Sequence, residues 1–174
     1  MIADELEAEL ELKLKANPDF VTQELKYYKL HESVKDPIYA TPGSACFDLH
    51  AWINEEKYGN TWAQIYPGQT LLVPTGLIFD IPMWWSLRLH PRSGLAVKNS
   101  VNLANCEGVI DSDYVEPVYV ALHNFGQTSF EIEDGMRICQ AELHLSPRTP
   151  LVSISEKPER KTEREGGFGS TGTK

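Results

Sequence analysis

Short segments that alternate apolar and polar side chains follow one another through most of this chain, with turn residues about every ten positions. The pattern is typical of β-strands with one buried face, because successive side chains of a strand point to opposite sides of the sheet. Many short strands at this spacing favour a sandwich or barrel over alternating strands and helices. The sequence therefore predicts an all-β domain, with strands within residues 25–30, 70–81, 84–89, 101–105, 118–122, 130–133 and 137–145.

One helix is predicted, at residues 2–16, where Ala, Glu, Leu and Lys dominate and apolar residues recur at helical spacing. Pro18 ends it, because the residue before a proline is pushed out of the helical region. Its plainest interpretation is a surface helix, packed on the body or on a partner subunit. After Pro147 the chain becomes polar, basic and finally glycine-rich. We therefore expect a helical extension (residues 1–24), a β-domain (25–156) and a flexible tail (157–174).

The composition excludes several classes of protein. The N-terminal residues are acidic and lack the pattern of a secretory signal, and no apolar run is long enough to span a bilayer, so a cytoplasmic location (the host cytoplasm, if the chain is viral) and no membrane partner are expected. A net charge of −9 argues against nucleic acid as a partner. Three cysteines without a C-x-x-C pair, and histidines without metal-ligand spacing, predict neither a disulfide framework nor a zinc site.

The sequence GVIDSDY at residues 108–114 concentrates Asp111, Asp113 and Tyr114 between two strand-like segments. We expect a β-hairpin that carries these side chains at its tip. Burying an aspartate costs free energy unless the carboxylate is paired, which favours a functional site here. Asp and Ser also favour ordinary turns, so the stretch by itself leaves both interpretations open.

Two polar side chains interrupt otherwise apolar strand segments. Asp48 follows a loop of small residues and stands among apolar neighbours, and Gln140 lies in a strand of mostly apolar residues. Buried carboxylates and amides need hydrogen-bond partners. Each residue alone is also compatible with a turn, cap or structural role.

Two glycine-containing stretches suit phosphate binding. In HPRSGLA at residues 90–96, Pro91 stops a strand and the following residues can begin a helix, which leaves free backbone N–H groups beside Arg92. The tail EREGGFGSTG at residues 163–172 has the composition of a flap that closes over phosphates. It is not a Walker loop, because the final Thr and Lys stand in the reverse order. An ordinary helix start and a flexible end without function remain alternatives.

Taken in chain order, the segments with Asp48, residues 90–96, residues 108–114, Gln140 and residues 163–172 resemble the five motifs of the trimeric all-β dUTP diphosphatases (dUTPases). The resemblance runs from about residue 37 to the C-terminus and is most specific at residues 91–96, 108–114 and 166–172. The resemblance implies a distorted jelly-roll β-sandwich or barrel with an added N-terminal helix. It implies a homotrimer in which three chains build each active site. The implied reaction is Mg²⁺-dependent hydrolysis of dUTP to dUMP and pyrophosphate by attack of water on the α-phosphate, which limits uracil in DNA and supplies dUMP for thymidylate synthesis.

The resemblance also implies roles for the catalytic candidates. Asp111 would orient and deprotonate the attacking water, while Arg92 and Ser93 would hold the phosphates. Asp48 and Gln140 would reach Mg²⁺ through water, with the metal bound mainly by substrate phosphates. The catalytic set is thus Asp111, Arg92, Ser93, Asp48 and Gln140.

The remaining candidates would bind the nucleotide. Tyr114 would pack against the deoxyribose so that a 2′-hydroxyl cannot fit, Asn105 and nearby backbone would read the uracil edge, and Phe168 would cover the base. Arg164 is expected on the γ-phosphate. The substrate-binding set is Ser93, Gly94, Asn105, Gly108, Val109, Ile110, Asp111, Tyr114, Arg164, Phe168, Gly169, Ser170 and Thr171.

Two other functions remain possible from the sequence. A dCTP deaminase of the same fold, or a bifunctional deaminase and diphosphatase, would use an acid-assisted water to replace an amine. A non-catalytic binding or regulatory protein of this fold is the second alternative. The order of residues 110–114 and the Gly-Phe-Gly tail favour the diphosphatase. Residues 52–69 form a longer link than is usual in the family, and we expect them to loop out.

Overall fold

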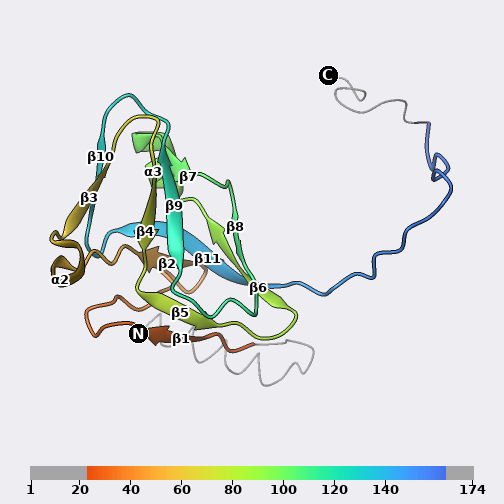
Figure 1. Ribbon diagram of the computed structural model, residues 1–174, viewed down its shortest axis with the longest axis horizontal. Coiled ribbons are helices and arrows are strands. Elements are labelled where there is room, and N and C mark those ends of the chain that lie inside the picture. The colour runs from red at the N-terminus through yellow and green to blue at the C-terminus, as the bar shows by residue number, and fades with distance from the viewer. Residues whose placement is uncertain (1–22, 164–174) are drawn as a thin grey trace.

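In the computed structural model, which describes residues 23–163, β-strands dominate (Figure 1). Each segment that the sequence predicts to be a strand overlaps one, and residues 70–81 contain two. The predicted helix at residues 2–16 lies outside the described residues. In chain order the elements are β1 (Lys26–Lys29), β2 (Phe47–His50), α2 (Glu55–Tyr58), β3 (Trp62–Ile65), β4 (Thr70–Pro74), β5 (Leu77–Asp80), β6 (Trp85–His90), α3 (Ser93–Asn99), β7 (Val101–Leu103), β8 (Gly108–Ile110), β9 (Tyr119–Asn124), β10 (Phe130–Glu133) and β11 (Arg137–Leu145).

The strands pair antiparallel in sheets of unequal size. The two larger sheets have the strand orders β2-β11-β6-β8 and β4-β9-β7, and two smaller sheets pair β1 with β5 and β10 with β3. The prediction of an all-β domain is confirmed. The alternative of a closed barrel is not confirmed, because the strand pairings within residues 23–163 leave these sheets open. No helix in this part of the chain has the length and apolar character that a membrane crossing requires.

Inward-facing residues of the two larger sheets share one apolar core. In β6 the buried Leu87 and Leu89 lie on either side of the more exposed Arg88, and in β9 Val120 and Leu122 alternate with more exposed residues. Burying such a side chain contributes about 1.5–3 kcal/mol, so alternation fixes which face of each strand turns inward. The opposite faces are left free to carry polar groups.

The stretch at residues 108–114 is not the tip of a simple hairpin. The flanking strands β7 and β9 do pair, with Leu103 opposite Leu122, as the sequence predicts. Residues 108–110, however, form β8, which joins β6 in the other large sheet. A turn follows, closed by a hydrogen bond of 3.2 Å from the Tyr114 N–H to the Asp111 carbonyl. The stretch therefore connects the two large sheets, an outcome that local periodicity cannot predict.

Residues 52–69 do not loop out. They contain α2 and β3, and β3 pairs with β10. Trp52, Ile53 and Ile65 are buried in the core. Helix α2 begins where the Asn54 side chain accepts a hydrogen bond of 3.2 Å from the Lys57 N–H. The extra length is thus part of the domain, and its apolar residues hold it there.

Gly76 lies between β4 and β5, at a position where a larger residue would have both backbone strain and a steric clash. Its φ is 71°, and an added Cβ would lie 2.5 Å from Val34 Cγ2 and 2.9 Å from Trp52 Cδ2. We expect Gly76→Ala to lower the free energy of unfolding by about 2–4 kcal/mol, because left-handed strain adds to overpacking. Urea denaturation measures the change. Gly59→Ala is the matched control, since Gly59 has a φ of 70° with open space around it. Equal losses in the two variants would contradict the packing explanation.

Candidate active site

A pocket of about 230 Å³ opens beside β8 and the turn that follows it. It is smaller than the roughly 300–1,000 Å³ of sites that enclose a whole drug-sized ligand, so it suits a base and sugar rather than a complete nucleoside triphosphate. The structure brings the predicted uracil and sugar residues together here. The lining residues are Leu89, Asn105, Gly108, Val109, Ile110, Asp111, Tyr114, Val118 and Tyr119.

The turn after β8 presents Asp111 and Tyr114 to this pocket. The Tyr114 hydroxyl donates a hydrogen bond of 3.1 Å to the Pro117 carbonyl, which fixes the ring while it stays 41% exposed. Asp111 is exposed and also lines a second pocket of about 330 Å³. Asp113 lines that second pocket and not the first. Asp111 is therefore accessible to water and substrate from the nucleotide pocket.

Asp48 is a buried acid whose two carboxylate oxygens are both paired. Only 2% of Asp48 is exposed, and its Oδ1 accepts a hydrogen bond of 3.2 Å from Arg92 Nε. Arg137 Nη1 donates to Oδ2 at 3.1 Å. Two cationic partners offset the cost of burying the charge. The sequence predicts Asp48 and Arg92 as site residues but not Arg137, because the contact of Arg137 with Asp48 depends on the pairing of β2 with β11.

His50 adds no further positive charge to this cluster. Burial lowers the pKa of His50, with Lys35, Arg137 and Arg92 lowering it further and Asp48 opposing them. A neutral imidazole at neutral pH leaves the two guanidinium groups as the charged partners of Asp48.

Arg92 keeps donors available for an anion. Its Nη1 also donates to the Arg137 carbonyl at 3.3 Å, but a guanidinium carries five N–H groups. Ser93 begins α3, as the sequence predicts, and no side chain caps the first turn of this helix. Nothing lies within 4 Å of a Cβ added at Gly94, so the approach is open. Spare guanidinium donors and uncapped backbone N–H groups thus lie side by side, which suits a phosphate.

Gln140 lies opposite Asp48 across the β2–β11 pair. Carboxylate and amide oxygens are ligands that Mg²⁺ accepts. Because both Asp48 oxygens already bind arginine, the pair suits contact with Mg²⁺ through bound water, for which each oxygen retains a lone pair. The donor set therefore fits the predicted metal in this indirect way.

Within one chain, the pocket with Asp111 and the phosphate-binding group around Arg92 lie toward opposite ends of β6. Ile110, which precedes Asp111, is opposite Leu87, and Arg92 lies five residues farther along the chain. At about 3.3 Å per residue this separation is roughly 17 Å. A phosphate bound by Arg92 and Ser93 is therefore out of reach of Asp111 in the same chain.

Comparison with known proteins decides the family. The dUTPase family matches residues 32–172, which is most of the chain. The chain belongs to the dUTPase family. The deoxyuridine 5'-triphosphate nucleotidohydrolase of Brucella melitensis is 44% identical over 137 residues, covering 79% of this chain and 84% of the relative. The one from Caulobacter vibrioides is 42% identical over 137 residues, with 78% and 84% covered.

Solved dUTPases share the fold at lower identity. A point mutant of the dUTPase of Staphylococcus bacteriophage 80alpha, with dUpNHpp, superposes with a TM-score of 0.72 at 21% identity, covering 87% of this chain and 99% of that one. A point mutant of the dUTPase of phage phi11 of S. aureus, described as revealing the coordination of a structural Mg(II) ion, gives a TM-score of 0.67 at 16% identity, covering 77% of this chain and 98% of that one. The mostly-β architecture described above is thus that of the dUTPases.

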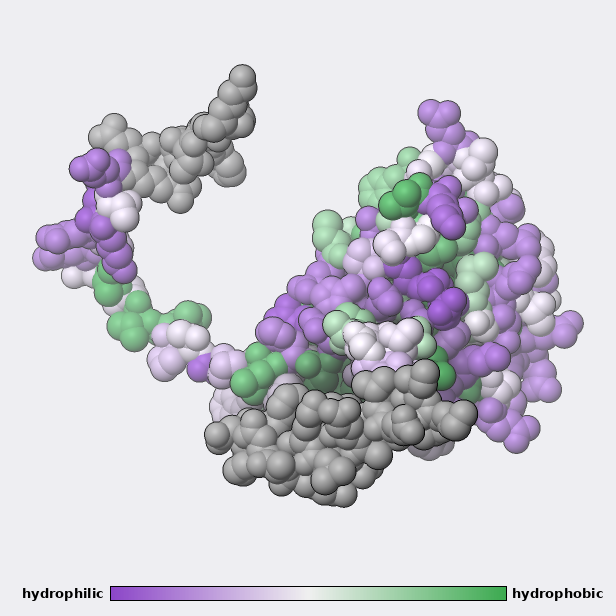
Figure 2. All heavy atoms as spheres, turned by 180° about the vertical axis from the view of Figure 1, so that it is seen from behind, coloured by the Kyte–Doolittle hydropathy of each residue, from purple (hydrophilic) through white to green (hydrophobic). Residues whose placement is uncertain are grey.

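The last of the five dUTPase motifs is not part of the described site. Arg164, Phe168, Gly169, Ser170 and Thr171 lie outside the described residues. The segment that leads toward them, residues 147–163, contains no strand or helix and runs away from the sheets (Figure 1). Its apolar side chains Leu151, Val152 and Ile154 are 96%, 79% and 63% exposed, and Figure 2 shows this segment with green hydrophobic residues clear of the body. These side chains make little contact with their own chain.

Proposed function

We propose that this chain hydrolyses dUTP to dUMP and pyrophosphate by attack of water on the α-phosphate. The observation that carries the proposal is the pocket at β8, which gathers Asn105, Asp111 and Tyr114 in a chain of the dUTPase family. Relatives at 42–44% identity bear the name of this activity. In the cell the reaction would limit uracil in DNA and supply dUMP for thymidylate synthesis.

The uracil ring binds against β8. Within the described residues β8 has a strand partner, β6, on one side only, so one row of its backbone N–H and C=O groups is free. The edge of uracil offers an N–H between two carbonyls, which can pair with such a row. Gly108 belongs here because its backbone approaches Leu89 closely, where an added Cβ would lie 3.0 Å from the Leu89 Cβ. Asn105 reads the same edge from the turn between β7 and β8.

The deoxyribose packs against the exposed face of Tyr114. The bond from the Tyr114 hydroxyl to Pro117 keeps the ring in one position. A fixed ring in contact with the 2′ carbon leaves no room for a 2′-hydroxyl, so the pocket selects deoxynucleotides over ribonucleotides.

Asp111 orients the attacking water and takes its proton. Arg92 and the N–H groups at Ser93 and Gly94 bind the phosphates, with Ser93 near the α,β-bridging oxygen where leaving-group charge develops. Bound Mg²⁺ supplies charge neutralisation at the phosphate oxygens. Asp48 and Gln140 would hold the ion through water, and the Asp48 bond also fixes the Arg92 guanidinium.

The active site is shared between chains of a homotrimer. The roughly 17 Å between the two halves of the site along β6 supports this, because acid and phosphate must meet at one phosphorus. Asp111 and the uracil pocket come from one chain, and Arg92, Ser93, Asp48 and Gln140 from another. The exposed apolar residues of segment 147–163 supply a surface that can bury against a third chain.

The tail of that third chain closes the site. Phe168 stacks over the uracil, Arg164 binds the γ-phosphate, and Gly169, Ser170 and Thr171 contact the phosphates. Closure excludes water other than the nucleophile.

A nucleotide-specificity assay tests the function directly. The purified full-length chain with Mg²⁺ is given dUTP, dCTP or UTP, and pyrophosphate and ammonia are measured separately. We expect pyrophosphate from dUTP, little from UTP, and no ammonia from dCTP. Ammonia release from dCTP would show that the chain is a deaminase instead. The absence of product from every nucleotide would indicate a non-catalytic binding protein.

A further inference from the structure

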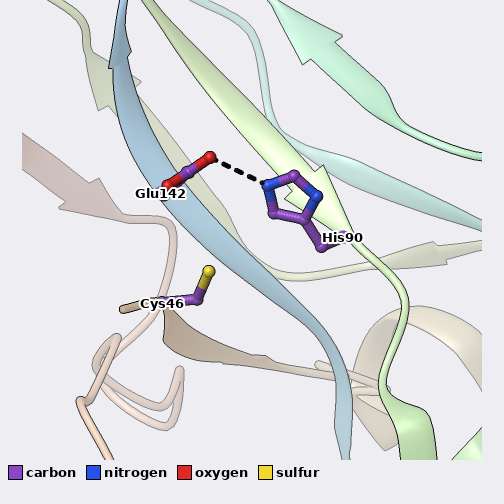
Figure 3. A group of neighbouring side chains, drawn as sticks. All are labelled: Cys46, His90 and Glu142. Carbon is purple, nitrogen blue, oxygen red and sulfur yellow. Dashed lines mark hydrogen bonds and ion pairs between the residues drawn. The ribbon is translucent and has the colours of Figure 1, made fainter. Parts of the chain in front are cut away.

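Cys46, His90 and Glu142 meet outside the catalytic set, although they are far apart in the sequence. One ligand atom from each residue lies within 4.8 Å of the others. Figure 3 shows the Cys46 sulfur, the His90 ring and the Glu142 carboxylate near one another. Glu142 Oε1 lies 3.2 Å from His90 Nε2. Of the three cysteines, Cys46 is half-buried, whereas Cys106 is exposed and Cys139 is buried.

Strand pairing creates this cluster. β11 lies between β2 and β6, with Ala141 opposite Phe47 and Gln140 opposite His90. Phe47 and Ala141 face the core, so Glu142, the next residue of β11, lies on the other face, and Cys46, which directly precedes β2, lies beside it. His90 shares that face because it pairs with Gln140, two residues from Glu142. The sheet thus fixes the positions of His90 and Glu142, and Cys46 lies in the bend that leads directly into β2.

Contrary to the expectation from the spacing of cysteines and histidines along the sequence, we propose that Cys46, His90 and Glu142 form a binding site for a divalent transition-metal ion of the zinc class. Thiolate, imidazole and carboxylate are the ligands of zinc, and three protein ligands with a water in the fourth position make a common zinc site. At zinc bond lengths, tetrahedral ligand atoms lie about 3.3–3.7 Å apart. The separation of His90 Nε2 and Glu142 Oε1, 3.2 Å, is close to the lower end of that range, and the Cys46 ligand atom lies within 4.8 Å of those of His90 and Glu142.

The surroundings of His90 fit a metal ligand. Metal-bound histidines usually direct their second ring nitrogen at a carboxylate, which orients the ring and strengthens its bond to the metal. His90 Nδ1 lies 3.8 Å from Glu107 Oε1, on the side opposite Glu142. Glu107 is itself held by Arg88 Nη1, at 2.9 Å from its Oε2. Each ring nitrogen of His90 therefore has its own acidic partner, one in the metal cluster and one behind it.

The site discriminates between metals by its chemistry. Mg²⁺ prefers oxygen ligands and binds thiolate and imidazole poorly, so the proposed Mg²⁺ of the reaction does not compete for it. The ion would join three segments of the largest sheet, at β2, β6 and β11. The ligands Cys46, His90 and Glu142 have no proposed role in dUTP hydrolysis, so metal binding at this site can be measured without turnover.

Cobalt substitution provides the test. The full-length, reduced protein in excess Mg²⁺ is titrated with Co²⁺, whose thiolate charge-transfer and tetrahedral d–d bands report its ligands, and Zn²⁺ is then added as competitor. We expect one Co²⁺ per chain with both bands, displaced by one equivalent of Zn²⁺, and a rise in Tm with Zn²⁺. Cys46→Ser should abolish the charge-transfer band, whereas Cys106→Ser, which changes a thiol elsewhere, should leave it unchanged.

Affinity measurements complete the test. His90→Gln and Glu142→Gln should weaken Zn²⁺ binding by at least about a hundredfold, and Glu107→Gln by about tenfold, as for an outer partner of a ligating histidine. His144→Gln, on the exposed end of β11, is the control and should bind normally. No saturable Co²⁺ spectrum, or a charge-transfer band that survives Cys46→Ser, would overturn the proposal. The cluster would then be a metal-free pairing of His90 with its two glutamates.

Discussion

Asp111→Asn is expected to bind dUTP normally and to lose about a thousandfold in turnover, since a positioned general base contributes about 10²–10⁴-fold. The amide has nearly the shape of the carboxylate, so the pocket is preserved, but it cannot take a proton from the attacking water. Pyrophosphate release measures kcat, and titration with a non-hydrolysable imido analogue of dUTP measures binding. A fall in kcat without loss of affinity identifies an interaction made in the transition state.

Asp113→Asn is the matched control for that variant. Asp113 occupies the same turn, yet it lines the second pocket rather than the nucleotide pocket. We expect its kcat to stay close to that of the unmodified chain. A near-normal kcat in Asp111→Asn would refute the assignment of Asp111 as base, and an equal loss in both variants would point to damage of the turn.

Deleting residues 163–174 is expected to reduce turnover by at least about a hundredfold while leaving the trimer intact. The reason is that the tail supplies the cover of the uracil and contacts to the phosphates, and closure of such lids completes a catalytic site. Steady-state kinetics with dUTP measures the loss. Light scattering after size exclusion measures the mass of the assembly.

The truncation separates catalysis from assembly. It leaves the sheets and the apolar residues Leu151, Val152 and Ile154 in place. Normal turnover in the truncated chain would rule out the closing tail. Dissociation into monomers would instead give the tail a role in assembly, which the proposal does not include.

The strands were predictable because each carries its own signal. In β9 and β11 the alternation of apolar and polar residues is local, so it survives without knowledge of partners. Pairing is not local. Nothing in residues 108–110 indicates that β8 joins β6, and the expected hairpin tip was wrong for this reason.

Residues 52–69 contain apolar and helix-capping residues that indicate an ordered segment, although the segment is longer than the corresponding link in the family. Trp52, Ile53 and Ile65 are apolar and lie on either side of Asn54 and Gly59, which suit the two ends of a short helix. These features predict an ordered segment. The expectation of a loop came from the usual length of this link in the family rather than from the residues.

The candidate site was predictable to the extent that its residues form contiguous motifs. Asp111 and Tyr114 share one motif, and the structure places both at one pocket. The contact of Arg137 with Asp48, and the meeting of Cys46 with Glu142, arise from pairing between strands distant in the sequence. No spacing rule along a single chain reveals such contacts.

Subunit mixing tests the central claim, dUTP hydrolysis at a site shared between chains, most directly. Asp111→Asn and Arg92→Ala should each be inactive as homotrimers. After unfolding and refolding together in equal amounts, random mixing should restore about a quarter of the activity of the unmodified chain, because each mixed ring contains one site with both residues intact. Turnover of dUTP is measured before and after mixing, with the trimer verified by mass. A mixture of folded, dUTP-binding trimers that stays inactive would contradict the shared site.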